Sequence, residues 1–216
     1  MKDFPKTKVV VFESSSKYQN VAKKQGVEKL TPERALIVEM VRRYWVLGIE
    51  CTILEIQKLA WFLERAIERR DIENVLNLEF KADRYGPYTP KLDHLLNHLD
   101  GSDLHCEKRL PDAKPMDTIW FEEVKRERVE RYLKTECQEW LPALEETDAL
   151  IDGFQTPLGL EALATVDWLI SREGVKPELS AIRSALSRWP GGEAAGARKH
   201  RIFSDDILRL ALEQVA

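Results

Sequence analysis

Three threonine–proline pairs constrain the fold of this chain more than any other feature, because each stands directly before apolar residues at helical spacing. They are Thr31-Pro32, Thr89-Pro90 and Thr156-Pro157. A threonine side chain accepts a hydrogen bond from a free amide at the start of a helix, and proline suits the first helical position, which needs no amide donor. We therefore predict helices that begin at these points, in a chain built mainly from helices.

The apolar spacing along the chain predicts the remaining elements. We expect helices over about 32–47, 52–63, 89–99, 122–144 with a break at Pro142, 156–170, 177–189 and 204–215. Strands are expected over 76–82, where apolar and polar residues alternate, and over 103–110 and 118–121. The glycine-rich segment 190–200 is predicted to be a flexible loop.

This order predicts an α+β fold that is mainly α. Residues 31–121 are expected to form a winged-helix-like subdomain with a small β wing, although its first strand would follow the second helix. Residues 122–216 are expected to form a helical subdomain packed against it. Residues 1–30 are predicted to hold one strand, at about 9–12, and a basic linker; a lone strand needs a sheet supplied from elsewhere.

Composition and charge exclude several classes of protein. Hydrophobic residues make up 44% of the chain, but the longest nearly apolar stretch, 158–170, is too short and too polar to span a bilayer. The first ten residues lack the apolar region of a secretion signal, and the three cysteines have no CxxC spacing, so we expect a cytoplasmic protein without a membrane partner. The net charge of −4, with a basic N-terminal segment, predicts an acidic folded part, which argues against a DNA reader.

Motifs of common enzyme families are absent from the sequence. It contains no nucleophile elbow, no phosphate-binding loop, no zinc-protease motif and no dinucleotide fingerprint. The spacing of His94, His98, His105 and Cys106 allows zinc. Leucines already occupy one face of that helix and place the histidines at its flank, so we predict no metal site.

Two carboxylates fall within the apolar helix predicted over 156–170. A desolvated carboxylate can act as a catalytic acid or base, because burial raises its pKa. We interpret Glu161 instead as a residue stabilised by the start of its helix, and Asp167 as facing solvent. The sequence therefore predicts no catalytic residue, no cofactor and no enzymatic activity. A zinc or carboxylate hydrolase built on His94, His98 and Glu161 stays open as an alternative.

The segment Tyr85–Tyr88 is the strongest candidate for recognition. Glycine and proline set a rigid turn that presents two tyrosines, and rigid tyrosines are good binding anchors. Either both rings pack beneath the turn or they contact a partner. The candidate partner-binding residues are Glu79, Asp83, Tyr85, Gly86, Pro87 and Tyr88.

Several separated motifs carry a resemblance to a known family. They are IQKLAWFLERA, LEFKADRYGPYTPKLDHLLNHLDG, DGFQTPLGLEALATVDWL, SRWP and KHRIFSDDILRLALEQ. In this order they resemble the C-terminal half of the DarG antitoxin family, and the strand–YGPY–helix piece is more loosely similar to SocA or Panacea antitoxin domains. FPKTKVVVFE resembles the last strand of the macrodomain that precedes this region in DarG.

The resemblance implies a non-enzymatic antitoxin domain. In the family, the C-terminal half binds and blocks a DarT-type toxin, which attaches ADP-ribose to thymidine in single-stranded DNA, and the macrodomain removes that ADP-ribose. Nearly all of the macrodomain is missing from this sequence, so hydrolase activity is expected to be absent. We expect a DarT-type toxin and the macrodomain as partners, and no direct contact with nucleic acid.

A mechanism of inhibition follows from charge. We hypothesise that the acidic body mimics DNA in the toxin's groove, with carboxylates in place of phosphates and with Tyr85 and Tyr88 in place of stacked bases. The alternative is a winged-helix DNA-binding transcriptional regulator. Its recognition helix would be 89–99, which offers only Lys91 against Asp93 to the phosphates.

Overall fold

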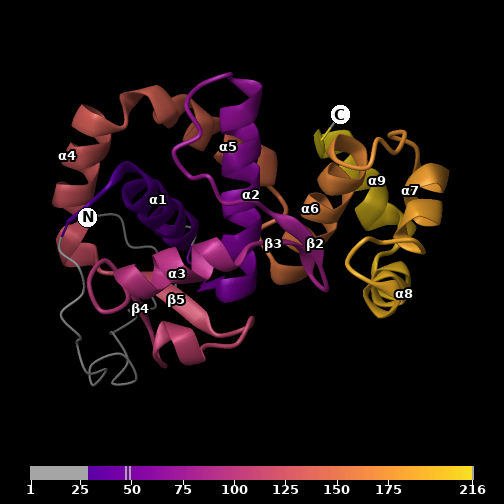
Figure 1. Ribbon diagram of the computed structural model, residues 1–216, viewed down its shortest axis with the longest axis horizontal. Helices are drawn as coiled ribbons and strands as arrows, with labels where there is room; N and C mark the ends of the chain where they lie inside the picture. The colour runs from indigo at the N-terminus through magenta and orange to yellow at the C-terminus, as the bar shows by residue number, and fades with distance from the viewer. Residues whose placement is uncertain (1–28, 47, 49, 216) are drawn as a thin grey trace, which may run out of the picture.

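The helices and strands of the computed structural model are described for residues 29–46, 48 and 50–215. Nine α-helices occur in these residues (Figure 1): α1 Pro32–Val46, α2 Ile53–Arg69, α3 Pro90–Leu99, α4 Arg126–Glu136, α5 Leu141–Ile151, α6 Pro157–Ser171, α7 Leu179–Leu186, α8 Glu193–Ile202 and α9 Asp205–Val215. The strands are β1 Cys51–Thr52, β2 Lys81–Asp83, β3 Gly86–Tyr88, β4 Leu104–Cys106 and β5 Thr118–Phe121. Three short 3-10 helices complete the order: η2 Leu110–Asp112, η3 Glu123–Lys125 and η4 Gln138–Trp140. The strand predicted at 9–12 and the basic segment through residue 28 lie outside the described residues.

Side-chain caps start two of the three helices that the threonine–proline pairs predict, whereas the prediction of a Thr31 cap is wrong: α1 begins at Pro32, but Thr31 Oγ1 is buried without a hydrogen-bond partner. Thr89 Oγ1 accepts a hydrogen bond from the Lys91 amide at the start of α3, and Thr156 Oγ1 accepts one from the Gly159 amide at the start of α6. At α2 the cap is reciprocal: the Thr52 hydroxyl oxygen accepts from the Glu55 amide, and the Glu55 carboxylate accepts from the Thr52 amide at 2.8 Å. Each cap satisfies amides that the helix itself leaves free.

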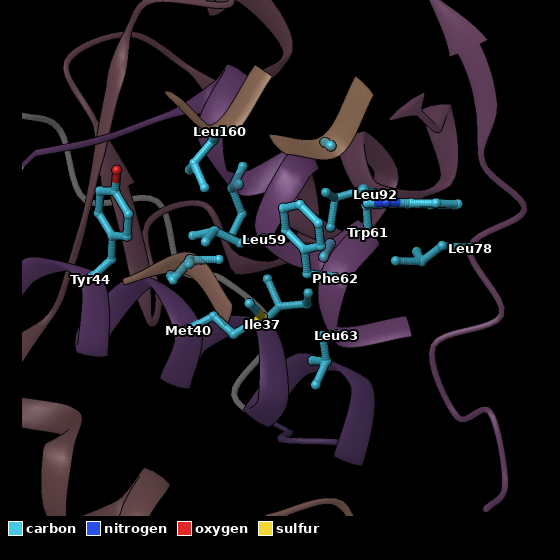
Figure 2. Close-up of a cluster of buried hydrophobic side chains, with 14 of the residues drawn as sticks. Ile37, Met40, Tyr44, Leu59, Trp61, Phe62, Leu63, Leu78, Leu92 and Leu160 are labelled. Carbon is cyan, nitrogen blue, oxygen red and sulfur yellow. The ribbon is translucent and has the colours of Figure 1, made fainter. Parts of the chain in front are cut away.

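One continuous apolar core joins the first and second halves of the described chain, with α2 at its centre. Of its seventeen residues, thirteen are buried. Figure 2 shows α2 side chains such as Phe62 packed between residues of α1 and a leucine of α6. Helices α5 and α6 both pack against α2, so the part before residue 121 and the part after it share this core. The expected subdomain division at residue 121 stays a prediction.

The expected winged-helix-like part with a small β wing is wrong. Strands β1, β5 and β4 form one antiparallel sheet in that order, and β1 precedes α2 instead of following it. A wing is a hairpin that projects into solvent, whereas all three residues of β4 are buried and β5 packs against α1. These short strands complete the core of a predominantly helical fold.

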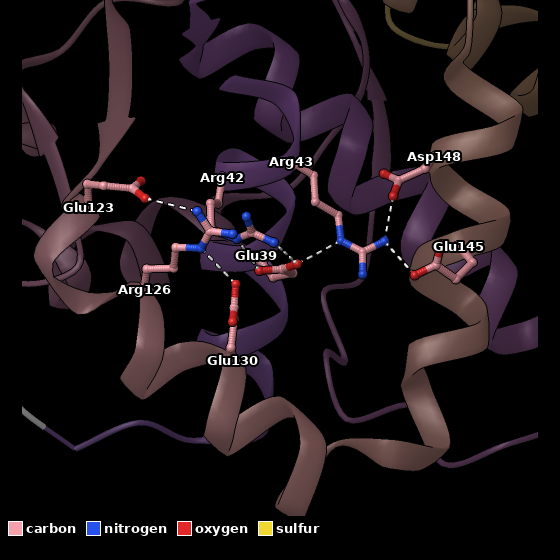
Figure 3. A network of polar contacts seen from close by, with 8 residues as sticks. All are labelled: Glu39, Arg42, Arg43, Glu123, Arg126, Glu130, Glu145 and Asp148. Atoms are coloured by element: carbon pink, nitrogen blue, oxygen red, sulfur yellow. Dashed lines mark hydrogen bonds and ion pairs between the residues drawn. The ribbon is translucent and has the colours of Figure 1, made fainter. Parts of the chain in front are cut away.

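A network of ion pairs fastens α1 to its neighbours (Figure 3). Glu39 is almost fully buried and accepts hydrogen bonds from the guanidinium groups of Arg42 and Arg43. Arg43 also pairs with Asp148 and, at 2.8 Å, with Glu145, both on α5. Because three carboxylates surround Arg43, this arginine has no capacity left for a ligand and is structural.

None of the helices among the described residues is both long enough and apolar enough to cross a membrane.

Helices α7, α8 and α9 gather at one end of the molecule, and the β2–β3 hairpin lies between that group and α2 (Figure 1). Strand β3 packs against both α2 and α6. The fold therefore places the Tyr85–Tyr88 segment where the two halves of the chain meet.

Candidate functional site

The β2–β3 hairpin holds five of the six predicted binding residues. Lys81 pairs with Tyr88, and Asp83 pairs with Gly86, which leaves Arg84 and Tyr85 as the turn. The strand predicted over 76–82 is wrong in its bounds, since β2 begins only at Lys81. The sixth residue, Glu79, lies before β2 and forms an ion pair with Lys91.

A buried lysine lies directly beneath the turn. Lys58 of α2 is fully buried, and its Nζ donates a hydrogen bond to the Pro87 carbonyl at 2.6 Å. Gly86 adopts a φ of +100°, a conformation that favours glycine, and a Cβ there would lie 3.4 Å from Lys58 Cε. Burial, followed by repulsion from Lys199, lowers the pKa of Lys58 to about 7. A neutral and a protonated amine are therefore both accessible near pH 7.

A second buried lysine shares a carboxylate with an arginine. Lys199 Nζ lies 2.8 Å from Glu161 Oε1 and 3.2 Å from Thr165 Oγ1, and Arg198 Nη1 lies 2.6 Å from the same Glu161 oxygen. Burial lowers the pKa of Lys199. The interpretation of Glu161 as a residue stabilised by the start of its helix is wrong, because it lies in the second turn of α6 and is 2% exposed. The carboxylate of Glu161 therefore binds two cations through one oxygen, which gives it a structural role as their shared partner.

Two arginines lie over the Tyr85 ring. The guanidinium carbon of Arg84 is 5.2 Å from the ring centroid, and that of Arg198 is 4.8 Å from it. Both distances fall within the range of cation–π attraction. Tyr85 is half-buried and Arg84 is exposed, so this face of the hairpin is accessible to a ligand.

The tip of the hairpin is clamped by the segment after α7. Trp189 Nε1 donates a hydrogen bond to the Asp83 carbonyl at 2.9 Å, and a Cβ on Gly191 would lie 2.7 Å from the same carbonyl. The prediction of a flexible loop over 190–200 is wrong, because α8 begins at Glu193. Gly196 lets α8 approach α7, since a Cβ there would lie 2.4 Å from a backbone oxygen of α7. These glycines provide close packing instead of flexibility.

Tyr88 faces a different environment from Tyr85. Its hydroxyl donates to Asp93, which also accepts from Gln57 Nε2 at 3.0 Å. Burial and the bond to Asp93 raise the pKa of Tyr88 to about 12. Beside it lies a cavity of about 310 Å³, lined by Ile53, Tyr88, Asp93, Leu96, Asn97, Leu110, Pro111, Ala113 and Pro115. This volume is at the small end of the range for ligand pockets. The Tyr88 face of the hairpin therefore offers a second surface for a small ligand, separate from the Tyr85 face.

The histidines and Asp167 have structural surroundings. His98 Nδ1 lies 2.7 Å from the His94 carbonyl, and His105 pairs with Glu122. Within residues 29–46, 48 and 50–215, no three histidine, cysteine or acidic side chains cluster in a way that would hold a metal ion. The interpretation of Asp167 as facing solvent is wrong: it is 6% exposed and accepts a hydrogen bond from Trp61 Nε1 at 2.8 Å.

Sequence reasoning missed the cations of the site. Lys58 has a local signal, because it interrupts the apolar run of IQKLAWFL within a helix. Arg198 and Lys199 have none, since they fall in the segment interpreted as a loop. Arg84 directly precedes Tyr85 but is not among the predicted binding residues.

Comparison with known proteins shows similarity to one group of enzymes, although no family model matches the sequence. A protein named "DNA ADP-ribosyl glycohydrolase" from Mycobacterium tuberculosis is 30% identical over 205 residues, which is 88% of this chain and 54% of the relative; its counterpart from Mycobacterium bovis has the same values. A protein of the same name from Thermus aquaticus is 30% identical over 180 residues, covering 83% of this chain and 47% of the relative. The chain thus spans about half the length of the curated relatives it matches.

These names correct the functional predictions made from the sequence. The relatives are named for an enzyme, which contradicts the expected non-enzymatic antitoxin domain and its inhibition of a DarT-type toxin by DNA mimicry. The name of an enzyme also contradicts the alternative of a winged-helix DNA-binding transcriptional regulator. The expected absence of nucleic acid among the partners is also contradicted, because the name specifies DNA. The resemblance and the charge argument predict a protein partner, whereas the relatives' names give a modified nucleic acid as the substrate.

Proposed function

We propose that this chain acts as part of an enzyme that removes ADP-ribose from DNA. The observation that carries the proposal is its similarity, at 30% identity over 88% of its length, to proteins named for this reaction. Because the substrate is DNA, we place the activity in the cytoplasm of a bacterial cell, where the chromosome lies.

The proposed role of the β2–β3 hairpin is to hold the substrate. Removal of ADP-ribose is the hydrolysis of a glycosidic bond in a molecule that carries many phosphates, so the enzyme needs positive charge and flat surfaces to bind it. Arg84, Arg198 and the Tyr85 ring offer both on one face of the hairpin. We therefore assign Tyr85, among the residues predicted to bind a partner, to a substrate-binding surface. In this proposal Asp83, Gly86, Pro87 and Tyr88 form the hairpin that positions Tyr85, and Glu79 pairs with Lys91 outside the surface.

The proposal is tested with the purified chain and a synthetic oligonucleotide that carries ADP-ribose on one base. Release of ADP-ribose is followed by liquid chromatography, and complex formation is followed by fluorescence anisotropy in the same samples. The unmodified oligonucleotide of identical sequence is the matched control. We expect release, or binding of the modified strand at least tenfold tighter than binding of the control. A chain that neither releases ADP-ribose nor distinguishes the two strands would overturn the proposal.

A further inference from the structure

Positive charge exceeds negative charge around Tyr85. Arg84 is exposed, and no carboxylate among the described residues forms an ion pair with it. Arg198 and Lys199 share one carboxylate, that of Glu161. One carboxylate balances the charge of one cation, so positive charge stays uncompensated on this face of the hairpin.

The other charged groups near the hairpin leave this balance positive. Asp83 is exposed and favours the charged forms of the two buried lysines, Lys58 and Lys199. When Lys58 is neutral, the three cations Arg84, Arg198 and Lys199 still outnumber the two carboxylates of Glu161 and Asp83, so a positive surplus remains. The net charge of −4 belongs to the whole chain and does not describe this face.

The Tyr85 ring provides a flat surface at a fixed position next to the two arginines. Its ring centroid lies 5.2 Å from the guanidinium carbon of Arg84 and 4.8 Å from that of Arg198, so the two cations are within about 10 Å of each other. Trp189 holds the hairpin tip through the carbonyl of Asp83. Bases of single strands stack on such rings, and guanidinium groups pair with phosphates through two parallel hydrogen bonds.

We infer that Arg84, Tyr85 and Arg198 form a binding surface for a single-stranded segment of DNA. The two arginines contact phosphates of the strand, and a base stacks on the face of the Tyr85 ring. The inference rests on the proposed function for the choice of DNA, and it names the part of the substrate that this surface holds. An acidic peptide would match the charge but has no flat ring for Tyr85, so the nucleic acid fits better.

The test measures binding of an unmodified, fluorescein-labelled oligothymidine of about twelve nucleotides by anisotropy. Wild type is compared with Arg84→Ala and Tyr85→Ala over a series of salt concentrations. Loss of one phosphate contact lowers the slope of log affinity against log salt by about 0.7. Loss of one stacked base weakens affinity about fivefold or more.

Two control variants separate the site from general effects. Arg131→Ala removes an exposed arginine of α4, at the far end of the molecule from the hairpin, and should leave the affinity within about twofold of wild type (Figure 1). Tyr85→Phe keeps the ring and should retain the affinity, whereas Tyr85→Ala should not. Melting temperatures check that every variant is folded.

Each outcome of the test decides the inference. Equal effects of Arg84→Ala and Arg131→Ala, absence of binding by wild type, or equal competition by a polyglutamate peptide would overturn it. Binding that depends on Arg84 and on the Tyr85 ring supports it. The probe carries no ADP-ribose, so this test is independent of the test of the proposed function. The chain could bind the probe as expected and yet neither release ADP-ribose nor prefer the modified strand. In that case this inference would stand and the proposed function would fail.

Discussion

Replacing Lys58 by methionine is expected to reduce the rise in the free energy of unfolding that the protein shows between about pH 7 and pH 10. Lys58 is fully buried, and the Pro87 carbonyl is the acceptor of its hydrogen bond at 2.6 Å. Burial and the neighbouring charge of Lys199 lower its pKa to about 7 in the folded state. In the unfolded chain the pKa of a lysine is about 10.4.

The sign and size of the effect follow from proton binding. Between these two pKa values the unfolded state holds a proton that the folded state has released, so the free energy of unfolding increases with pH. Below pH 7 both states are protonated, and the full cost of burying the charge is present. Each pH unit contributes about 1.4 kcal/mol, so from pH 7 to pH 9.5 the rise is roughly 3 kcal/mol.

The assay is urea denaturation at about pH 6 and pH 9.5, followed by tryptophan fluorescence. The quantity compared is the change in the free energy of unfolding between the two pH values, which should be about 3 kcal/mol smaller in Lys58→Met than in wild type. Lys81→Met, an exposed lysine of the same hairpin, is the control and should match wild type. If Lys58→Met keeps the wild-type pH dependence, the argument from burial is refuted.

Three further variants test the contacts that hold the site together. Glu161→Gln should lower the free energy of unfolding in urea by about 3 kcal/mol, because it leaves buried Lys199 without its counter-charge. Adding Lys199→Met to the same chain should recover part of that loss. A double variant no more stable than Glu161→Gln contradicts the pairing. Trp189→Phe should cost about 1 kcal/mol and speed hydrogen exchange near Asp83, since one buried hydrogen bond is lost; unchanged exchange there argues against the clamp. Gly196→Ala should lower stability by roughly 2 kcal/mol because its Cβ meets the backbone of α7; a neutral result in thermal unfolding shows that the two helices can separate freely.

Local signals in the sequence predicted the helix starts well. The caps at Thr89 and Thr156, and the reciprocal pair of Thr52 with Glu55, use groups at most three residues apart. Such contacts form whatever the rest of the chain does, so their pattern is visible without knowledge of the fold. The prediction of a mainly helical chain rests on these positions.

The alternation over 76–82 misled the prediction because a loop produced it. Leu76 and Leu78 are buried, but Asn77 and Glu79 have φ values of 44° and 54°, in the left-handed region. The buried carboxylate of Glu64 accepts a hydrogen bond from the Leu78 amide at 2.8 Å and fixes this path. Over 76–80, alternate side chains therefore point inward without strand pairing, which begins only at Lys81.

The electrostatic surroundings of the site were beyond sequence reasoning for a different reason. Glu161 and Asp167 find their partners far along the chain, at Lys199 and Trp61. A carboxylate in an apolar helix has the same pattern whether its partner is water or a distant lysine. Only the packing of α6 against α2, and the contact of Lys199 on α8 with Glu161, decide which of these is true.

The clamp at the hairpin tip has a consequence for biosynthesis. The Trp189 indole that secures the Asp83 carbonyl lies 106 positions downstream. A ribosome that adds roughly 5–20 residues per second delivers that indole on the order of ten seconds after the hairpin emerges. A nascent chain released before that tryptophan would have both strands of the hairpin but not the contact that secures its tip.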